Sequence, residues 1–194
     1  MQFERSGLFK VIQQNYHCTT VLYPGSSIHI TPSFYFPHVV YIDTNEVAQK
    51  FFADSDAVLN FVSSHKKYKQ SSFVRFINQD FATALTIKEN SFDLLIALFA
   101  GGISRACKKY LKIGGVLLTN NHHNDASEAA RDNEYQLIAR LFRKGAAYQI
   151  CEKEDDGIPP KNPAAKRAYL KRSDSGFIYT DNEDYFLFNK VHLK

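Results

Sequence analysis

A glycine turn and a carboxylate stand at the ends of two short apolar runs in the first quarter of the chain. The run 19–23 leads into the turn 24–27, which contains Gly25, and the β-branched run 39–42 ends on Asp43. Such a turn lets backbone N–H groups approach a ligand, and a carboxylate at a strand tip accepts hydrogen bonds from ribose hydroxyls. The spacing predicts a strand, a tight turn, a short crossover and a second strand that together bind a nucleotide.

Gly25 and Asp43 each have a structural interpretation beside the functional one. Gly25 also suits an ordinary strand-to-helix turn, and isolated glycine motifs often occur without a ligand. Asp43 also suits a cap on the helix that follows it, a position that Asp fills readily. The choice stays open at Gly25, and the ribose interpretation is slightly favoured at Asp43.

Another acid and two histidines follow later strands of the predicted sheet. Asp80 comes after the run 73–77, where a solvated Asp is common. His122 and His123 lie in the polar loop 120–125, and an imidazole that titrates near neutral pH can serve as a general base. Adjacent histidines in a loop are not typical of a metal site, and the sequence favours a solvated loop over a catalytic base.

Length, charge and cysteine spacing limit the class of protein. A chain of 194 residues predicts a single domain, 1–194, with an N-terminal lead-in at 1–17 and a surface insertion at 152–176. The net charge of +4 permits an anionic partner without requiring one. Three cysteines without C-x-x-C spacing indicate neither a disulfide framework nor a zinc site. With no apolar signal segment and no run near the ~20 residues that span a bilayer, a cytoplasmic location is expected.

Apolar periodicity divides the chain into alternating strands and helices. Strands are expected at 19–23, 39–42, 73–77, 94–99, 116–119, 146–151, 177–179 and 185–191. Helices are expected at 7–14, 44–52, 55–65, 103–111 and 127–144, with a proline-led turn at 31–36 and a glycine C-cap at 112–115. This alternation predicts an open, mostly parallel α/β sheet, whose first four strands end at one ligand-binding edge. That edge would carry Gly25, Asp43, Asp80 and the loop 99–102.

The order of these features resembles the class I S-adenosylmethionine-dependent methyltransferases over about residues 19–191. The segment 21–27 stands where that family has its glycine-rich first motif. Asp43 matches the acid that holds the ribose, and Asp80 matches the residue that contacts the adenine amino group. The resemblance lies in the shared order and spacing of these matches, because each one alone is weak.

Later segments continue the resemblance. The segment 91–95 is similar to the family's fourth strand, and 111–118 is similar to its L-x-P-G-G entry to the fifth. The strands 146–151 and 185–191 resemble its final antiparallel hairpin. The resemblance implies a Rossmann-like, open, mostly parallel seven-stranded sheet with helices on both faces and a C-terminal antiparallel hairpin.

The resemblance also implies a cofactor, S-adenosylmethionine, and methyl transfer to an acceptor that the sequence does not identify, with a small molecule expected first. Displacement at the methyl group needs alignment of the reactants, and a base only where the acceptor is protonated, so no catalytic residue is named. No metal site is expected. The residues expected to bind the cofactor are Tyr23, Gly25, Ser26, Asp43, Thr44, Asp80, Phe81 and Phe99.

The chain departs from the family's first motif at three positions. Tyr23 replaces the usual acid, Ser27 stands at the second glycine, and His29 stands at the third. These changes favour one alternative, a non-catalytic Rossmann-like binding module that has lost the cofactor. A nicotinamide dehydrogenase is a third interpretation, which the terminal strand pair and the incomplete G-x-G-x-x-G disfavour. The basic run 161–172 permits nucleic-acid contact, but a solvated face is the stronger interpretation.

Overall fold

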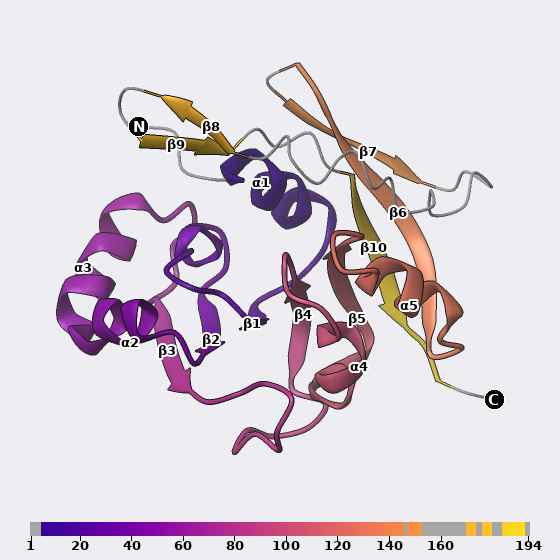
Figure 1. The fold of residues 1–194 in the computed structure, drawn as a ribbon, viewed down its shortest axis with the longest axis horizontal. Coiled ribbons are helices and arrows are strands. Elements are labelled where there is room, and N and C mark those ends of the chain that lie inside the picture. The colour runs from indigo at the N-terminus through magenta and orange to yellow at the C-terminus, as the bar shows by residue number, and fades with distance from the viewer. Residues whose placement is uncertain (1–4, 146, 153–169, 174–175, 180–183, 193–194) are drawn as a thin grey trace.

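One large sheet organises the part of the chain that the computed structural model describes, residues 5–145, 147–152, 170–173, 176–179 and 184–192 (Figure 1). Within these residues the sheet has eight strands in the order β3-β2-β1-β4-β5-β10-β6-β7. The parallel strands are β1 (Thr20–Pro24), β2 (His38–Asp43), β3 (Phe73–Asn78), β4 (Phe92–Ala97) and β5 (Leu111–Asn120). The antiparallel part comprises β6 (Tyr135–Lys144), β7 (Ala147–Glu152) and β10 (Tyr185–Lys190). A separate antiparallel pair is formed by β8 (Leu170–Ser173) and β9 (Gly176–Tyr179).

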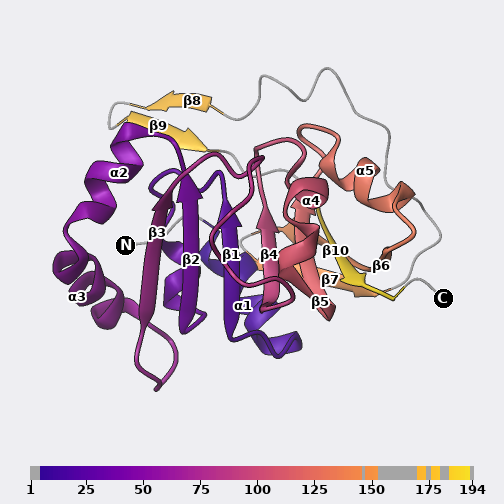
Figure 2. The same ribbon diagram turned by 90° about the horizontal axis from the view of Figure 1, so that it is seen from below.

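Helices cover both faces of this sheet, with α1 behind it and α4 in front of it in Figure 2. One face packs against α1 (Ser6–Asn15), the 3-10 helix η1 (Thr31–Phe34), α2 (Glu46–Ala53) and α3 (Ser55–His65). The other packs against α4 (Ile103–Ala106), the 3-10 helix η2 (Lys108–Tyr110) and α5 (Asp125–Arg131). The prediction of a Rossmann-like α/β fold is therefore confirmed.

Local sequence signals explain the elements around β2. Val39 to Ile42 are buried on both faces of the sheet, as expected of a strand between two helical layers. The Asn45 side chain accepts a hydrogen bond from Val47 N at 2.7 Å and starts α2. Asp54 caps α3 in the same way, because its Oδ1 accepts from Ala57 N at 3.0 Å.

The long helix predicted at 127–144 is wrong. The helix ends at Arg131, because the Asp132 carboxylate accepts a hydrogen bond from Glu134 N at 2.9 Å and turns the chain. Residues 135–144 then form β6, which pairs with the apolar strand β10 from Tyr135 to Leu141. Tertiary pairing thus overrides the helical spacing of the apolar residues, and with β6 the main sheet has eight strands where a seven-stranded sheet was predicted.

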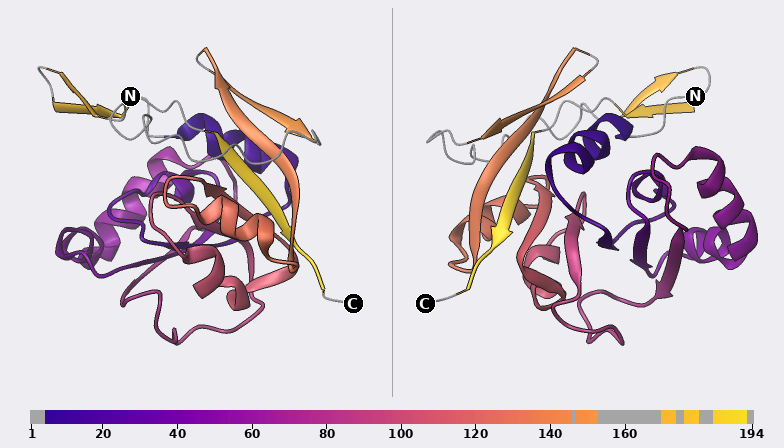
Figure 3. Two further views of the ribbon diagram at one scale, coloured as in Figure 1. Left: turned by 45° about the vertical axis from the view of Figure 1, so that its right-hand side comes forward. Right: turned by 180° about the vertical axis from the view of Figure 1, so that it is seen from behind.

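The predicted final hairpin is also corrected. The strand predicted at 146–151 is found as β7, but its partner is β6 and not the strand predicted at 185–191. That later strand, β10, lies between β5 and β6 and is antiparallel to both. Figure 3 shows the long β6–β7 hairpin beside α1, and a Cβ added at Gly7 of α1 would lie 3.0 Å from the Tyr148 ring.

The glycine pair at 114–115 belongs to a strand and not to a helix C-cap. β5 already begins at Leu111, and the pairing register between β4 and β5 shifts between Phe92 and Leu94. Gly114 has a φ of +77°, so it supplies the left-handed conformation that this bulge needs. The helix predicted at 103–111 is correspondingly shorter.

Several predictions fall outside the described residues. These are most of the surface insertion 152–176, positions 161–169 of the basic run, and the lead-in before residue 5.

Candidate functional site at the carboxyl ends of the strands

The carboxyl ends of the five parallel strands lie at one edge of the sheet. The chain runs outward from β1 to β3, and then returns to the other side of β1 for β4 and β5. Strand order therefore reverses between β1 and β4, which is where open α/β sheets bind ligands. The predicted site residues all belong to the last positions of these strands or to the loops that follow them.

Asp43 ends β2 and connects two loops at this edge. Its Oδ2 accepts a hydrogen bond from Ser27 N at 2.7 Å, and its Oδ1 accepts from Asn45 N at 2.9 Å. The carboxylate therefore holds the turn after β1 and supports the start of α2, while its side chain stays half-buried and Thr44 beside it is exposed. The structure brings Asp43 and the glycine turn together, as the sequence predicts, but the cap of α2 is Asn45 and Asp43 only holds the N–H of that cap residue.

The turn after β1 requires glycine at its first position. Gly25 has a φ of +64°, and its N–H donates to Ile42 O at 2.8 Å. A Cβ at Gly25 would lie 2.9 Å from the Cβ of Ala100, so the loops after β1 and β4 are in close contact. Ser26 is buried, and its hydroxyl donates to Ser27 O at 3.3 Å, so it acts within the turn.

Tyr23 points into the core rather than out of the strand end. Its side chain is buried beside Tyr41, and its hydroxyl forms a hydrogen bond of 3.0 Å with His29 Nδ1. Burial raises the pKa of Tyr23 to about 12, so its hydroxyl stays protonated. Burial and the charge of Arg5 lower the pKa of His29 to about 3, so the imidazole stays neutral. A neutral pair thus occupies the position at which the resemblance expects an acid.

The loop after β3 places its two predicted residues differently. Asp80 is exposed, and its Oδ1 accepts a hydrogen bond from Ala82 N at 2.9 Å, which forms a local turn. Phe81 is half-buried, and its Cε1 lies 3.9 Å from the position of a Cβ at Gly25. Phe81 therefore borders the glycine turn, whereas the Asp80 carboxylate is engaged in its own loop.

Phe99, which follows β4, lies where three segments meet. It has a φ of +61°, which is unusual for an aromatic residue, and its ring is 5.5 Å from the ring of His122 in the loop after β5. The rings of His122 and His123 are 4.6 Å apart, and a Cβ at Gly101 would lie 3.0 Å from the His123 Cβ. The loops after β4 and β5 are therefore packed together beside Phe99.

The sequence interpretation missed one residue at this edge, Arg5. Its guanidinium lies 4.4 Å from the centre of the Phe99 ring, and its Nε donates to the Tyr185 hydroxyl at 3.1 Å. The side chain is 9% exposed. No motif marks Arg5, because its position depends on how α1 packs against the sheet.

The buried carboxylate of Asp125 accepts hydrogen bonds from α4. Asp125 is 1% exposed, and its Oδ1 accepts from both the N–H and the hydroxyl of Ser104, at 3.2 and 2.9 Å. Its Oδ2 accepts from the Thr119 hydroxyl at 3.0 Å. Burial raises the pKa of the Asp125 carboxyl although these bonds oppose the shift. The network ties α4, α5 and the end of β5 into one support for the Phe99 loop.

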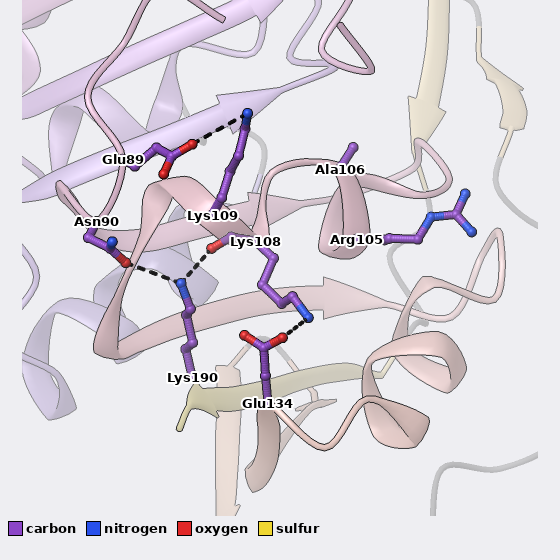
Figure 4. A pocket seen from close by; sticks show the side chains of 8 residues that line it. All are labelled: Glu89, Asn90, Arg105, Ala106, Lys108, Lys109, Glu134 and Lys190. Atoms are coloured by element: carbon purple, nitrogen blue, oxygen red, sulfur yellow. Dashed lines mark hydrogen bonds and ion pairs between the residues drawn. The ribbon is translucent and has the colours of Figure 1, made fainter. Parts of the chain in front are cut away.

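A cavity of about 320 Å³ lies at the opposite, amino edge of the sheet (Figure 4). Among the cations that line it, Lys108 contacts Asp132 and Glu134, and Lys109 contacts Glu89. The ammonium of Lys190 donates to Leu111 O at 2.8 Å, to Lys108 O at 3.0 Å and to Asn90 Oδ1 at 3.3 Å. These contacts give the cavity the character of a structural junction between η2, β5 and β10. The residues that line it are Glu89, Asn90, Arg105, Ala106, Lys108, Lys109, Glu134 and Lys190.

Replacing Lys190 by methionine is expected to lower the free energy of unfolding by about 1–2 kcal/mol, because three oxygens lose a donor that is only 5% exposed. Urea denaturation followed by circular dichroism measures the change. Lys109→Met is the matched control, because Lys109 lines the same cavity but is exposed. The unfolding midpoint of this variant should match that of the parent protein. Equal midpoints for all three proteins would show that Lys190 does not stabilise the junction.

Among residues 5–145 and the shorter described stretches, no group of three or more His, Cys, Asp or Glu side chains is placed to hold a metal ion. Every helix in the same part of the chain is too short or too polar to cross a lipid bilayer.

Comparison with known proteins identifies the fold and not the sequence family. The sequence matches no family model and no curated protein. TomG, an O-methyltransferase from Streptomyces achromogenes solved in complex with SAM, is 10% identical, with 97% of this chain and 80% of that chain covered at a TM-score of 0.54. An rRNA methylase from Streptococcus thermophilus is 8% identical, with 95% of both chains covered at a TM-score of 0.53.

A third similar structure is named as a decarboxylase and not as a methyltransferase. A precorrin 8W decarboxylase from Methanobacterium thermoautotrophicum is 17% identical, with 98% of this chain and 91% of that chain covered at a TM-score of 0.54. At such identities the likeness defines the architecture only. This chain has the Rossmann-like fold found in S-adenosylmethionine-dependent methyltransferases.

Proposed function

We propose that this protein is a methyltransferase that binds S-adenosylmethionine at the carboxyl ends of β1, β2 and β4 and methylates a small-molecule acceptor. The observation that carries the proposal is the convergence of Asp43, the Gly25 turn and Phe81 at the edge where strand order reverses. The fold is shared with methyltransferases such as TomG, which was solved with the cofactor.

The residues at this edge fit the adenosine half of the cofactor. Each oxygen of Asp43 accepts one backbone hydrogen bond, and a carboxylate oxygen can accept a second, so capacity remains for the ribose hydroxyls. Phe81 offers an apolar, half-buried ring beside the turn, which suits an adenine face. The absence of a side chain at Gly25 lets the backbone come close to whatever lies against it.

The proposed methyl transfer requires the protein mainly to align the cofactor with the acceptor. When bound, S-adenosylmethionine would supply a methyl group to a nucleophile that attacks the methyl carbon, and the sulfur would leave with the bonding electrons as the neutral thioether. The residues of this chain hold the ribose at Asp43 and border the acceptor side with Phe99 and His122. The His122 imidazole can accept the proton that a hydroxyl acceptor loses.

Asp43→Ala is expected to weaken the binding of S-adenosylmethionine and S-adenosylhomocysteine by about tenfold, because two ribose hydroxyls lose a charged acceptor. Isothermal titration calorimetry measures the affinity. Asp54→Ala is the matched control, because Asp54 also accepts a hydrogen bond near the start of a helix and lies away from this edge. Equal affinities for the Asp43 variant and the parent would remove Asp43 from the site.

A non-catalytic binding module is the second candidate, and the Tyr23–His29 pair favours it. This neutral pair stands where an acid would contact the ammonium of the cofactor or its water. A ligand that binds only the folded state raises the melting temperature, so a thermal-shift titration separates the candidates. No shift with millimolar S-adenosylmethionine or S-adenosylhomocysteine would support the module, and a shift with NAD alone would support a dehydrogenase.

A further inference from the structure

One face of β2 and β3 has no helix over it in the part of the chain that the structure describes. Val74 and Phe76 of β3 pack with the layer of α2 and α3. Side chains alternate along a strand, so Phe73 and Arg75 point to the opposite face. On that face α4 lies in front of β4 and β5 in Figure 2, and the crossover from β3 to β4, residues 79–91, contains no helix. Parallel strands are usually covered on both faces, so this surface is one that a partner can reach.

An aromatic pair lies at the amino end of this surface. His38 begins β2 and Phe73 begins β3, and the two residues are register partners. Their rings are 5.9 Å apart in an edge-on arrangement. His38 is exposed, and Phe73 is 50% exposed although it is large and apolar. An exposed aromatic ring on an open sheet is a platform on which a nucleic-acid base can stack.

The segments that build this surface carry positive charge and no acid. The stretch 57–79, from α3 through β3, contains the exposed cations Lys67, Lys69 and Arg75 and no Asp or Glu. The stretch 5–42, which includes β1 and most of β2, has no acid either. Positive charge without neighbouring carboxylates attracts the phosphates of a nucleic acid.

The crossover after β3 brings two acids, and both are engaged elsewhere. The Asp80 carboxylate accepts a hydrogen bond within its own turn, at the carboxyl edge of the sheet. Glu89 contacts Lys109 at the cavity shown in Figure 4. Neither acid therefore neutralises the lysines that precede β3.

The loop that carries these lysines is held in shape by other residues. The Tyr68 hydroxyl lies 2.9 Å from both Ser33 O and the Ser72 hydroxyl. In Figure 2 the loop extends beyond the amino ends of β1 and β2. Lys69 precedes Phe73 by four positions, so their Cα atoms are at most about 14 Å apart. A short oligonucleotide can therefore contact the loop and the aromatic pair together.

We propose that this surface binds single-stranded RNA. We call it the open face, and its residues are His38, Lys67, Lys69, Phe73 and Arg75. A base stacks on the Phe73 ring while the three cations contact phosphates. Gln70 and Ser71 are exposed between the lysines and the ring, and they offer hydrogen bonds to the 2′-hydroxyls that distinguish RNA from DNA. The open face lies at the amino ends of the strands, so the inference is independent of the cofactor site proposed at their carboxyl ends.

Fluorescence anisotropy with a labelled oligouridylate of about 12 nucleotides tests the proposal. Phe73→Ala should weaken binding about tenfold, because stacking on the ring is lost. Phe73→Tyr keeps a ring and should keep the affinity of the parent protein. Ile113→Ala is the matched control, because Ile113 is 52% exposed on β5, away from the open face, and its loss should leave the affinity unchanged.

The salt dependence of binding tests the phosphate contacts. Each contact to a single strand contributes about 0.7 to the slope of log affinity against log salt concentration. Replacing Lys67 and Lys69 together by glutamine should therefore make the slope less steep by about 1.4. Replacing Lys10 and Lys50 by glutamine removes the same charge from exposed positions of α1 and α2, and it should leave the slope unchanged.

Duplex RNA and single-stranded DNA of the same length should bind more weakly, because the first has no free bases to stack and the second has no 2′-hydroxyls. Equal binding of the DNA would overturn RNA as the occupant. The proposal is wrong if the parent protein does not bind the oligouridylate at low salt, or if Phe73→Ala binds it as tightly as the parent. Should Phe73→Ala not fold, as judged by circular dichroism, Arg75→Gln takes its place and should reduce the slope by about 0.7.

Discussion

Replacing Asp93 by alanine is expected to lower the free energy of unfolding by about 3 kcal/mol. The Oδ2 of this β4 residue accepts from Thr19 N at 3.0 Å and from Thr20 N at 2.9 Å, and from the hydroxyls of both threonines at 2.9 and 2.8 Å. Its Oδ1 contacts Lys112 Nζ of β5 at 2.5 Å. One carboxylate thus joins β1, β4 and β5 at the amino edge, and its loss leaves several donors without their acceptor.

Guanidinium denaturation of Asp93→Ala and the parent protein measures this change. Asp93→Asn keeps the shape but not the charge, so its loss should be intermediate. Lys112→Met tests the ion pair alone, and because that lysine is 43% exposed, its effect should be small. A loss below about 1 kcal/mol for Asp93→Ala would show that solvent replaces the four hydrogen bonds at Oδ2.

The same carboxylate predicts a dependence on acid. Partial burial alone would raise the pKa of Asp93, but hydrogen bonds from Lys112, Thr20 and Thr19 outweigh burial and hold the pKa well below its usual range. A depressed folded-state pKa means that the stabilisation is complete above the unfolded value of 3.8 and is lost as the pH falls below it. The difference between the parent and Asp93→Asn should therefore shrink below about pH 4.

As the pH is lowered, protonation of His29 should destabilise the protein at pH values well above those at which Asp93 is protonated. Burial and the charge of Arg5 lower the pKa of His29 from 6.5 to about 3. The unfolded chain therefore binds a proton between these values that the folded chain excludes, and stability falls with decreasing pH across this window. At 1.4 kcal/mol per unit, the loss from about pH 7 to about pH 5 is about 2 kcal/mol. Solvent reduces this loss of stability, because part of the His29 side chain is exposed.

Urea denaturation at the two pH values measures this loss, and His29→Gln is the matched variant. Glutamine does not titrate and can still hydrogen-bond the Tyr23 hydroxyl, so the variant should lose markedly less stability between the same pH values. If the parent and His29→Gln lose stability equally, the imidazole takes up its proton without disturbing the folded protein. The prediction would then be wrong.

The parallel half of the fold could be predicted from sequence because its signals are local. Each of β1 to β4 is an apolar run that ends in a turn or an acid, and the observed bounds differ from the predicted ones by two residues at most. The position of Asp43 followed from the strand it ends. Its hydrogen bond to Ser27 N required the exact path of the turn, which no spacing rule provides.

In the antiparallel half, the strands β7 and β10 were predicted to within one residue, but β6 and the pairing order were not, because pairing depends on distant segments. Residues 135–144 have apolar side chains at a spacing that suits a helix, and pairing with β7 and with β10, far along the chain, makes them a strand. Arg5 escaped notice for the same reason, since its contacts with Phe99 and Tyr185 join positions remote in sequence. Tyr23 and His29 were seen as departures from a motif, but not as partners of each other.

The place of β10 in the sheet sets an order of assembly. Among the strands of the described residues this one comes last in the chain, yet it lies between β5 and β6 and is hydrogen-bonded on both sides. During synthesis, β5 and the β6–β7 hairpin leave the ribosome before β10, their common partner. Until β10 is made, β5 and β6 each have one unpaired strand edge. Synthesis of Tyr185–Lys190 closes both edges at once, so a nascent chain stalled before that point would expose two surfaces prone to aggregation.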